Sequence, residues 1–559
     1  VYFYRNKIYS MKHFLLTTLF VFSPITVFSQ QNLVETQKIE TLSKVWGFLK
    51  YYHTEVAVGK YNWDEQFIGI LPEIRKAENS EQLSQVYLTW LDRLGTVKPC
   101  KKCNPDPDKE YFDKNFNLSW TQDTTLFTKE LSSRLKYIED NRFQGKPYYI
   151  SIYNTGQIEV INEPKYENFE YPNEEYRLLA LVKYWNIIEY FFPYKYMTDQ
   201  DWDDVLTEMI PKFTNAKDTT EYHLTMQELV AKTDDAHAFL GSEYVFKYFG
   251  GKWIPAIFKI IDDKAVITSF YNDSLARLND LRIGDVITHV DNKAVSNILE
   301  ANFKYVPASN YPTKLRYSYN KVLNGSSDSL TVVFDRDGKL FKRKIARYFF
   351  NSFNFNSDAK DDERKWEILE GNIGYVRMDK IVGRNNLNVI DDLKNTKAII
   401  FDLRKGTSAS LGVSRKLNSK SKIFSNSTYP DLSYPGKFLW GRDETGSSSG
   451  KNYEGLVVIL VAEGTQSQAE YVAMSLQTAE NAVTIGSQTA GADGNTVPFV
   501  FLGEYQTLIT GLGIYYPDRT PAQRKGVKVD IEVKPTIQGI REGRDEVLER
   551  ALKYIEENR

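Results

Sequence analysis

A chain of 559 residues is too long to fold around one hydrophobic core, so roughly three or four domains are expected. Its composition, with 42% hydrophobic and 26% charged residues, is that of an ordinary water-soluble protein. The formal net charge of −2 argues against a nucleic-acid partner or an anionic membrane surface, because both attract a clustered basic excess.

The start of the chain has the pattern of an export signal. Residues 11–30, "MKHFLLTTLFVFSPITVFSQ", have a short basic start, an apolar middle and a small-residue end. This pattern is typical of a secretory signal peptide and is too short for a stable membrane anchor. Residues 1–10 precede Met11, where we expect translation to start. We therefore predict a removable signal within residues 1–30, a periplasmic or extracellular location, and no stable membrane anchor.

Residues 31–170 and 171–245 contain two copies of one helical pattern. "LSKVWGFLKYYH" and "YNWDEQFIGILPEI" in the first region return as "LVKYWNIIEYFF" and "DQDWDDVLTEMIPKF" in the second. Rare residues match at one constant offset: Trp46 with Trp185, Trp63 with Trp202, and Pro72 with Pro211. Apolar residues at i, i+3 and i+4 predict that each copy is a helical hairpin. We expect a helical and mixed domain over 31–170, followed by a second helical repeat over 171–245.

The cysteines of the chain, Cys100 and Cys103, lie in "KPCKKCNPD" within the first region. In a reducing cytosol this spacing could serve redox chemistry or form half of a zinc site. The chain has no second cysteine pair and no histidine near this one. In an exported protein, that context favours a local disulfide that closes a loop.

The periodicity changes twice in the remainder of the chain. From 246 to 347, "AIFKIIDDKAVITSF", "LRIGDVITHVDNKAV" and "SLTVVFDRDGKLFKRKIAR" predict a domain of β-strands. From 360 to 559, strands such as "NIGYVRM", "AIIFDLR" and "LVVILVA" alternate with helices such as "AEYVAMSLQTA". This alternation predicts a mostly parallel sheet with helices on its faces, and "GRDEVLERALKYIEENR" predicts a closing amphipathic helix. The fold class is therefore multi-domain, with helical N-terminal repeats, a β domain and an α/β core.

A serine lies where the chain turns from a buried strand into a helix. The segment "GTQSQAEYVAMSLQ" follows the apolar run at 456–462 and places Ser467 at the mouth of the turn. Serine caps helices well, but the same position suits a nucleophile, because neighbouring backbone N–H groups hold the oxyanion that its attack creates. The local pattern leaves both roles open. Glu470, one helical turn on, either orders such a site or is a first-turn acid that complements the helix dipole.

A serine nucleophile needs a base. After removal of the signal, the chain keeps these histidines: His53, His223, His237 and His289. His289 alternates like a strand residue, His53 belongs to the first repeat copy, and His223 begins a polar helix. His237 follows a helix in "TDDAHAFLG", beside Asp234 and Asp235. A carboxylate beside an imidazole fixes its tautomer and raises its basicity, although an incidental histidine at a solvated acidic helix end is the alternative.

Metal and cofactor chemistry are not supported. His237 is accompanied by no HxxxH or HxH pattern and by no dense cluster of acids. The glycine turns "LNGSSD" and "GADGN" do not have the form of phosphate-cradling loops. No metal and no cofactor are therefore expected.

The ordered set of segments resembles the secreted C-terminal-processing (tail-specific) proteases, serine peptidases that share a catalytic core with tricorn protease. "LRIGDVITHVDNKAV" resembles the PDZ signature of that family, and "NIGYVRM" with "AIIFDLR" resembles its first core strands. "TQSQAE" resembles the nucleophile segment, "VTIGSQTAGADG" the strand and glycine turn after it, and "GVKVDIEVKPT" the final core strand. The resemblance covers roughly 175–556. It implies a PDZ-like domain at 246–347, a ClpP/crotonase-like α/β core at 360–559, and Ser467 as the nucleophile.

The chain departs from the family pattern in places that matter to the chemistry. Ala492 occupies the position of the family's lysine base, so the resemblance points to the tricorn-like branch, whose histidine lies where His237 stands. The late glutamate of that branch is matched by Gln523, which can orient an imidazole but carries no charge. The family's Gly-Gly oxyanion donor after the "DLR" strand is replaced by "KGTSAS", which leaves the backbone N–H of Ser408 or Ala409 for that role.

Two functions from different classes remain. The first is an exported serine endopeptidase with Ser467 as nucleophile, His237 as base, and the N–H of Gln468 in the oxyanion hole. It would need no cofactor and would cleave unstructured or C-terminal peptide segments delivered by the PDZ-like domain. The second is a catalytically degenerate, protease-like peptide-binding or scaffold protein of the periplasm, which Ala492, Gln523 and the lost Gly-Gly favour. The oligomeric state does not follow from the sequence.

Overall fold

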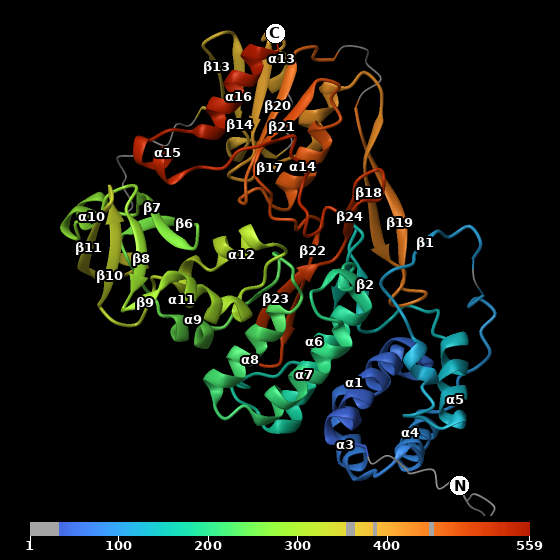
Figure 1. Ribbon diagram of the computed structural model, residues 1–559. Helices are drawn as coiled ribbons and strands as arrows, with labels where there is room; N and C mark the ends of the chain where they lie inside the picture. Colours follow the sequence, from blue (N-terminus) through green and yellow to red (C-terminus); the bar gives the residue numbers. More distant parts are fainter. Residues whose placement is uncertain (1–32, 105, 354–363, 384–387, 447–451, 559) are drawn as a thin grey trace, which may run out of the picture.

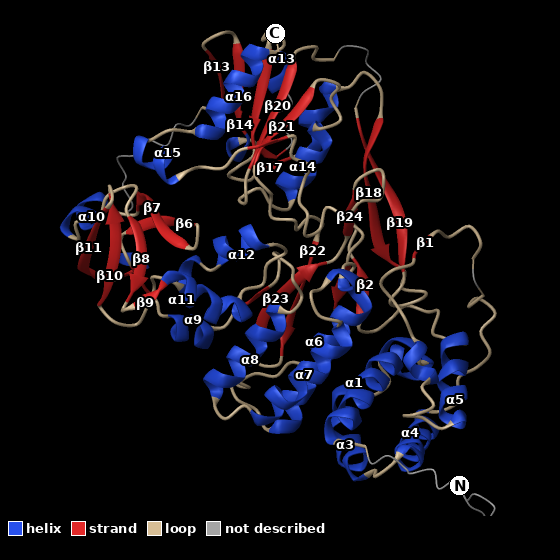
Figure 2. Ribbon diagram, in the orientation of Figure 1, coloured by secondary structure: helices blue, strands red, loops and turns tan. Residues whose placement is uncertain are grey.

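The computed structural model describes residues 33–104, 106–353, 364–383, 388–446 and 452–558, and the predicted signal at 1–30 lies outside them. A helical body, a small β domain and an α/β core surround the middle of the molecule (Figure 1). Coloured by secondary structure, the first of these is almost entirely helical, while helices and strands are layered in the core (Figure 2). None of the helices in the described residues is long and apolar enough to cross a membrane.

The helical body contains two similar groups of helices. They are α1 (Glu35–Tyr52), α3 (Trp63–Lys76) and α4 (Ser80–Leu94), then α6 (Glu174–Phe191), α7 (Trp202–Asn215) and α8 (Thr219–Ala231). The indole N–H of Trp46 donates to the carbonyl of Trp63 at 2.9 Å, and that of Trp63 donates back at 3.0 Å. Trp185 and Trp202 exchange the same two bonds at 2.8 and 3.1 Å. Because a buried indole needs an acceptor, these reciprocal bonds tie α1 to α3 and α6 to α7 in the same way.

One hydrophobic core serves both groups and extends into the C-terminal half of the chain. Side chains of α1 and α6 belong to the same cluster as Phe438, Phe501 and Tyr515. The hydroxyl of Tyr52 also donates to the carbonyl of Pro435 at 2.6 Å. The helical body is therefore anchored to segments that follow it by several hundred residues. Outside this core, Cys100 and Cys103 are joined by the expected disulfide.

The β domain is an antiparallel sheet with its own core. Its strands are ordered β11 (Lys339–Ala346), β10 (Ser329–Arg336), β8 (Val286–Val290), β7 (Lys264–Phe270) and β6 (Ala256–Ile261). Helices α10 (Asp273–Leu278) and α11 (Val295–Asn302) contribute Ala276, Val295 and Leu299 to a cluster that is separate from the helical core. Buried Asp285 accepts from the guanidinium of Arg336 at 2.7 and 2.8 Å, which ties the "RIGD" turn to β10. The strands predicted over 246–347 thus form a sheet with a hydrophobic cluster of its own.

The C-terminal core is built on a mostly parallel sheet, as the alternation of strands and helices predicts. Its strands are ordered β13 (Trp366–Leu369), β14 (Ile373–Arg377), β16 (Ala398–Asp402), β20 (Leu456–Val461), β21 (Ala482–Gly486) and β25 (Ile531–Glu532), and only β13 runs antiparallel to its neighbour. Helix α14 (Gln468–Leu476) packs against Ile399 and Phe401 on one face. Helix α16 (Glu546–Glu557) packs against Ala398 and Ile400 on the other. Burial on both faces explains why these strands are continuously apolar.

A small sheet connects the helical body to the core. Strand β4 (Phe239–Leu240), which follows α8, pairs with β23 (Tyr505–Thr510), and β23 pairs with β22 (Thr496–Phe501). The register places Leu240 opposite Thr507. This pairing brings the segment that contains His237 to the C-terminal core.

Candidate active site

Ser467 lies in a strained turn between β20 and α14. Its backbone has φ 57° and ψ −126°, a region that non-glycine residues rarely occupy. An ordinary N-cap residue is instead extended, with negative φ. The turn is held from both sides, because the N–H of Ser467 donates to the carbonyl of Ala492 at 2.9 Å and its carbonyl accepts from the N–H of Glu470 at 2.8 Å. A sharp strand-to-helix turn of this kind presents a side-chain hydroxyl at the top of a sheet.

Glu470 connects the start of α14 to the glycine turn that follows β21. Its fully buried carboxylate accepts from the N–H of Gly491 at 2.7 Å, of Ala492 at 3.0 Å and of Ser467 at 3.3 Å, and from the hydroxyl of Thr489. Burial raises the pKa of Glu470 above its ordinary value, while these hydrogen bonds act in the opposite direction. Glu470 therefore positions the Ser467 turn through the backbone.

The residue at the position of the family's lysine base is buried and fully engaged in hydrogen bonds. Ala492 is completely buried, and both its N–H and its carbonyl are used by the Ser467–Glu470 turn. Sequence reasoning missed its neighbour Asp493. That carboxylate accepts from the N–H of Gly494 at 2.7 Å through Oδ1, while its buried Oδ2 has no partner among the described residues. Burial and the nearby Glu470 raise the pKa of Asp493 well above its usual range.

A hydrogen-bonded chain sets the protonation of His237. Nδ1 of His237 lies 2.8 Å from Oγ1 of Thr510, whose hydroxyl donates to Asp235 at 2.9 Å. The Asp235 carboxylate is completely buried and also accepts from the N–H of Thr510 at 2.7 Å and of His237 at 3.1 Å. Because the single hydroxyl proton of Thr510 points to the carboxylate, Thr510 Oγ1 accepts a hydrogen bond from the Nδ1–H group of His237. The neutral imidazole then carries its proton on Nδ1 and its lone pair on Nε2.

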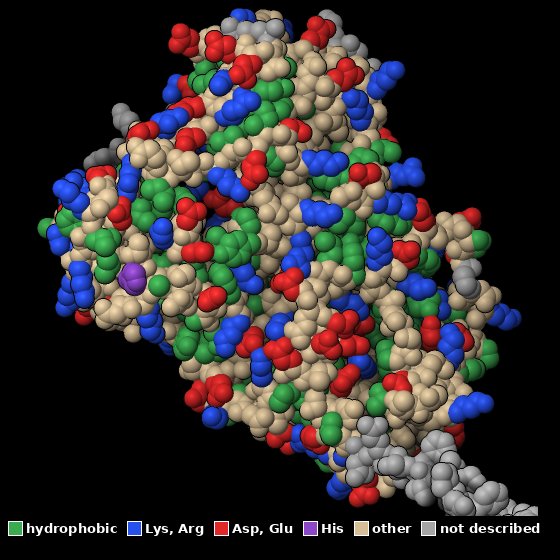
Figure 3. Space-filling model, in the orientation of Figure 1, with side chains coloured by type: hydrophobic (Ala, Val, Ile, Leu, Met, Phe, Trp, Pro, Cys, Tyr) green, Lys and Arg blue, Asp and Glu red, His purple; other side chains and the backbone are tan. Residues whose placement is uncertain are grey.

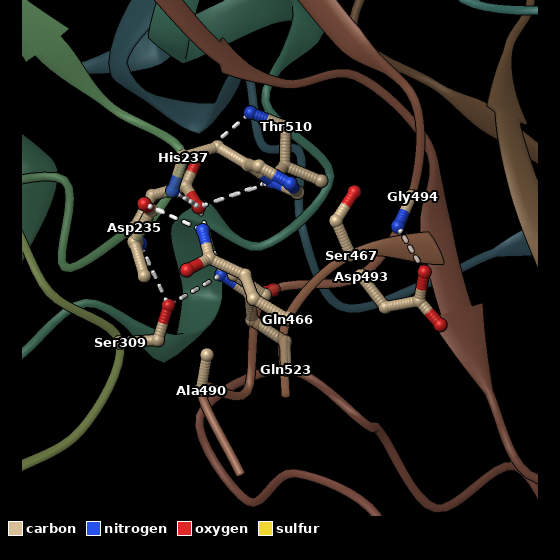
Figure 4. Close-up of polar contacts among 12 residues, drawn as sticks. Asp235, His237, Ser309, Gln466, Ser467, Ala490, Asp493, Gly494, Thr510 and Gln523 are labelled. Atoms are coloured by element: carbon tan, nitrogen blue, oxygen red, sulfur yellow. Dashed lines mark hydrogen bonds and ion pairs between the residues drawn. The ribbon is translucent and has the colours of Figure 1, made fainter. Parts of the chain in front are cut away.

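Nε2 of His237 is buried and has no hydrogen-bond partner within the described part of the chain. In the view of Figure 4, Ser467 lies on the opposite side of the His237 ring from Asp235. Burial lowers the pKa of His237, and Asp235, with its Oδ1 3.9 Å from Nδ1, raises it in part. The ring is therefore neutral at physiological pH, with a free basic nitrogen.

Of the two acids next to His237 in the sequence, only Asp235 supports the imidazole. Asp234 instead accepts from the N–H of Asp199 at 2.7 Å and lies 3.7 Å from Nη1 of Arg524. Gln523 is the residue expected from the sequence to orient the imidazole. Its side-chain amide lies 3.4 Å from Oδ1 of Asp235, the carboxylate that supports the imidazole through Thr510. The same amide lies 3.4 Å from Oγ of Ser309, which in turn accepts from the N–H of Ala236 at 2.8 Å.

The residues just before the serine and the histidine are bonded to each other, a link that sequence reasoning missed. The side-chain amide of Gln466 donates to the carbonyl of Ala236 at 3.0 Å. Tyr317, at the end of α12 (Tyr311–Tyr317), places its hydroxyl 3.0 Å from that carbonyl and 2.7 Å from Oε1 of Gln466. Adjacency to Ser467 was the only sequence signal for Gln466, and nothing in the sequence indicates Tyr317. Figure 4 shows Gln466 on the same side of Ser467 as the histidine.

The predicted oxyanion donors differ in their availability. The backbone N–H of Gln468, first in α14, has no acceptor in the portion of the chain that the structure describes. Its side chain donates to the carbonyl of Ala409 at 2.9 Å and so ties α14 to β17 (Ser408–Ala409). The N–H of Ala409 already donates to the side chain of Thr407 at 3.0 Å, whereas Ser408 is exposed. The N–H of Gln468 is therefore available to a bound group.

The other histidines have structural partners. His53 caps the short helix after it by accepting from the N–H of Glu55 at 3.3 Å. His223 lies in buried surroundings in α8, between the carbonyl of Glu170 at 3.0 Å and the hydroxyl of Ser242 at 2.8 Å. Burial lowers the pKa of His53 and of His223 to about 4. Among the described residues, no group of three or more His, Cys, Asp or Glu side chains is arranged to hold a metal ion.

Comparison with known proteins identifies the core. Residues 372–533 match the model of peptidase family S41 and include Ser467, Glu470 and Gln523, whereas His237 lies outside the match. The structure of mature CPAF complexed with lactacystin aligns with a TM-score of 0.53 and 13% identity over 68% of this chain and 98% of that one. The structure of mature CPAF aligns with a TM-score of 0.52 and 13% identity over 66% of this chain and 94% of that one. These two likenesses concern the fold. Residues 372–533 are thus similar to peptidase family S41, a family of serine peptidases.

Proposed function

We propose that this protein is an exported serine endopeptidase in which Ser467 is the nucleophile and His237 the base. The observation that carries the proposal is the state of the imidazole, whose Nδ1 is bonded through Thr510 to Asp235 and whose Nε2 is free. The bond between Gln466 and Ala236 supports the pairing, because it joins the two turns that carry the reacting groups.

The reaction would proceed through an acyl-enzyme. Oγ of Ser467 attacks the peptide carbonyl while its proton passes to Nε2 of His237. Asp235, acting through Thr510, stabilises the imidazolium that forms. The N–H of Gln468 binds the oxyanion, and the imidazolium then gives its proton to the leaving amine. Water activated by the same nitrogen hydrolyses the ester and restores the serine.

We further propose that residues 246–347 form a PDZ-like domain that delivers unstructured or C-terminal segments of proteins. An antiparallel sheet with two short helices and a separate core supports this assignment. A sheet edge can pair with an extended peptide, so such a domain supplies binding and not chemistry. The disulfide between Cys100 and Cys103 supports an oxidising location such as the periplasm or the cell exterior.

A fluorophosphonate probe tests the proposal, because only a base-activated serine reacts with it rapidly. We expect labelling at Ser467, with none in Ser467→Ala and slow labelling in His237→Ala. Ser475→Ala is the matched control, since the hydroxyl of this buried serine of α14 donates to the carbonyl of Val472 at 2.7 Å. Absence of labelling in a folded wild-type protein would favour the peptide-binding or scaffold function instead.

A further inference from the structure

A cavity of about 380 Å³ has His237 in its wall. It lies between β4, helix α9 (Glu243–Phe249) and the segment 317–324. Much of its lining is apolar and aromatic: Phe239, Leu240, Val245, Phe246 and Phe249. Phe239 and Phe246 remain 40% and 53% exposed, although large apolar side chains are normally covered. The size and lining are those of a binding pocket for a small group.

Lys321 gives the lining of this cavity a positive charge. None of the described residues that line the cavity is Asp or Glu, and Lys321 forms no ion pair within the described part of the structure. Its Nζ lies 3.2 Å from Oδ1 of Asn320 and 5.0 Å from the ring centre of Phe249. Burial lowers the pKa of Lys321 to about 8, so the side chain is still mainly an ammonium ion at neutral pH. A half-buried ammonium among aromatic rings is stabilised when an anion reaches it.

The cavity shares residues with the proposed reaction centre. Ala236, His237 and Tyr317 all line it. The carbonyl of Ala236 and the hydroxyl of Tyr317 are both bonded to Gln466, the residue before Ser467. A peptide whose scissile carbonyl reached Ser467 would therefore place an adjacent group at the mouth of the cavity.

We infer that this cavity is the specificity pocket of the enzyme and that it takes a carboxylate carried on an aliphatic stem, with Lys321 as the residue that recognises the charge. The inference rests on the proposed peptidase function and names its substrate class. The phenylalanines would contact the stem, and the ammonium would meet the carboxylate. Such a carboxylate is supplied either by a glutamate side chain beside the scissile bond or by the α-carboxylate of a chain end.

Binding to the full-length Ser467→Ala protein tests the pocket without turnover. The probes are short acetylated alanine–leucine peptides that carry glutamate, glutamine or leucine at one position, each as a C-terminal acid and as an amide. By calorimetry we expect a carboxylate peptide to bind about tenfold or more tightly than its neutral partner. The glutamate–glutamine pair reports a side-chain source, and the acid–amide pair reports a chain end. Equal binding of charged and neutral peptides, or no binding, would overturn the inference.

Variants at Lys321 assign the recognition to one residue. In the Ser467→Ala protein, Lys321→Met should remove the preference for carboxylates, while Lys321→Arg should keep most of it. Lys304→Met changes an exposed lysine outside the cavity lining and should alter nothing. A preference that survives Lys321→Met would contradict the assignment. The comparison of peptides needs no change at Lys321, so it decides the question even if a variant folds poorly.

Labelling of wild-type Ser467 by fluorophosphonate is scored separately, because it reports the nucleophile and not the cavity. A labelled enzyme without preference for carboxylates would leave the proposed function standing and remove this inference. Selective binding of carboxylates without labelling of Ser467 would remove the proposed function and leave the inference about the cavity standing. The protein would then be a peptide-binding protein with an acid-selective pocket.

Discussion

The side-chain amide of Gln466 donates a 3.0 Å hydrogen bond to the main-chain carbonyl of Ala236, across 230 positions of sequence. These residues immediately precede Ser467 and His237. The bond therefore joins the strained turn of the proposed nucleophile to the turn of the proposed base. On the face drawn in Figure 3, basic and acidic side chains are interspersed.

Gln466→Ala should lower kcat at least tenfold while changing KM little, because it loosens the alignment of the two turns and not the binding of substrate. Steady-state kinetics on one peptide would measure both constants. Gln477→Ala, at the other end of α14, removes a bond to Thr484 of 2.8 Å and should leave kcat unchanged. An effect on KM alone would show that Gln466 contacts substrate and does not position the turns.

Thr510→Val should reduce kcat/KM by roughly ten- to a hundredfold, because the nonpolar replacement breaks the only hydrogen-bonded path from Asp235 to Nδ1 of His237 in the described structure. Thr510→Ser restores the hydroxyl and should recover most of the activity. Thr507→Val makes the same change in the same strand and serves as the control. If the valine and serine variants were equally active, the proposed tautomer mechanism would be wrong.

The pH profile should report His237. The base must be neutral, so kcat/KM rises as pH rises through the pKa of the imidazole. Because burial lowers that pKa from 6.5, with Asp235 opposing the change, the midpoint of the acidic limb should lie below pH 6.5. His237→Ala should remove this limb and lower activity by roughly a hundredfold or more. A midpoint well above pH 7 would point to a different base.

Ala492→Lys should neither add a base nor rescue His237→Ala. Ala492 is fully buried, and its N–H and carbonyl hold the Ser467 turn, so a lysine there places an unpaired ammonium in a closed space. We expect a loss of several kcal/mol in the free energy of unfolding, measured by denaturant titration. Ala492→Ser is the conservative control. Recovery of activity in the double variant His237→Ala, Ala492→Lys would revive a serine–lysine mechanism.

The sequence predicts those structural features whose signals lie within short segments of the chain. The apolar run before Ser467 and the alternation of strands and helices predicted the parallel sheet and its strand-to-helix turn. The constant offset between the tryptophans pointed to helix pairs whose indoles exchange the same bonds. His237 was distinguished by its acidic neighbours and by a family resemblance.

What the sequence could not indicate depends on contacts between distant segments. Thr510 is an ordinary strand residue until β4 and β23 pair and bring it to His237. Tyr317 meets Gln466 across 149 positions, and no periodicity encodes that contact. Asp234 and Asp235 are equivalent in the sequence, and only the backbone of the turn decides which carboxylate lies behind the imidazole.

The pairing of β4 with β23 also determines when the proposed catalytic residues can come together. His237 and Thr510 are 273 positions apart, so the histidine is synthesised long before the strand that fixes its proton. A nascent chain that has not reached residue 467 carries the histidine without Ser467 and without its supporting threonine. If His237 and Ser467 act as proposed, the chain therefore cannot cleave peptides until β23 has been synthesised and has paired with β4.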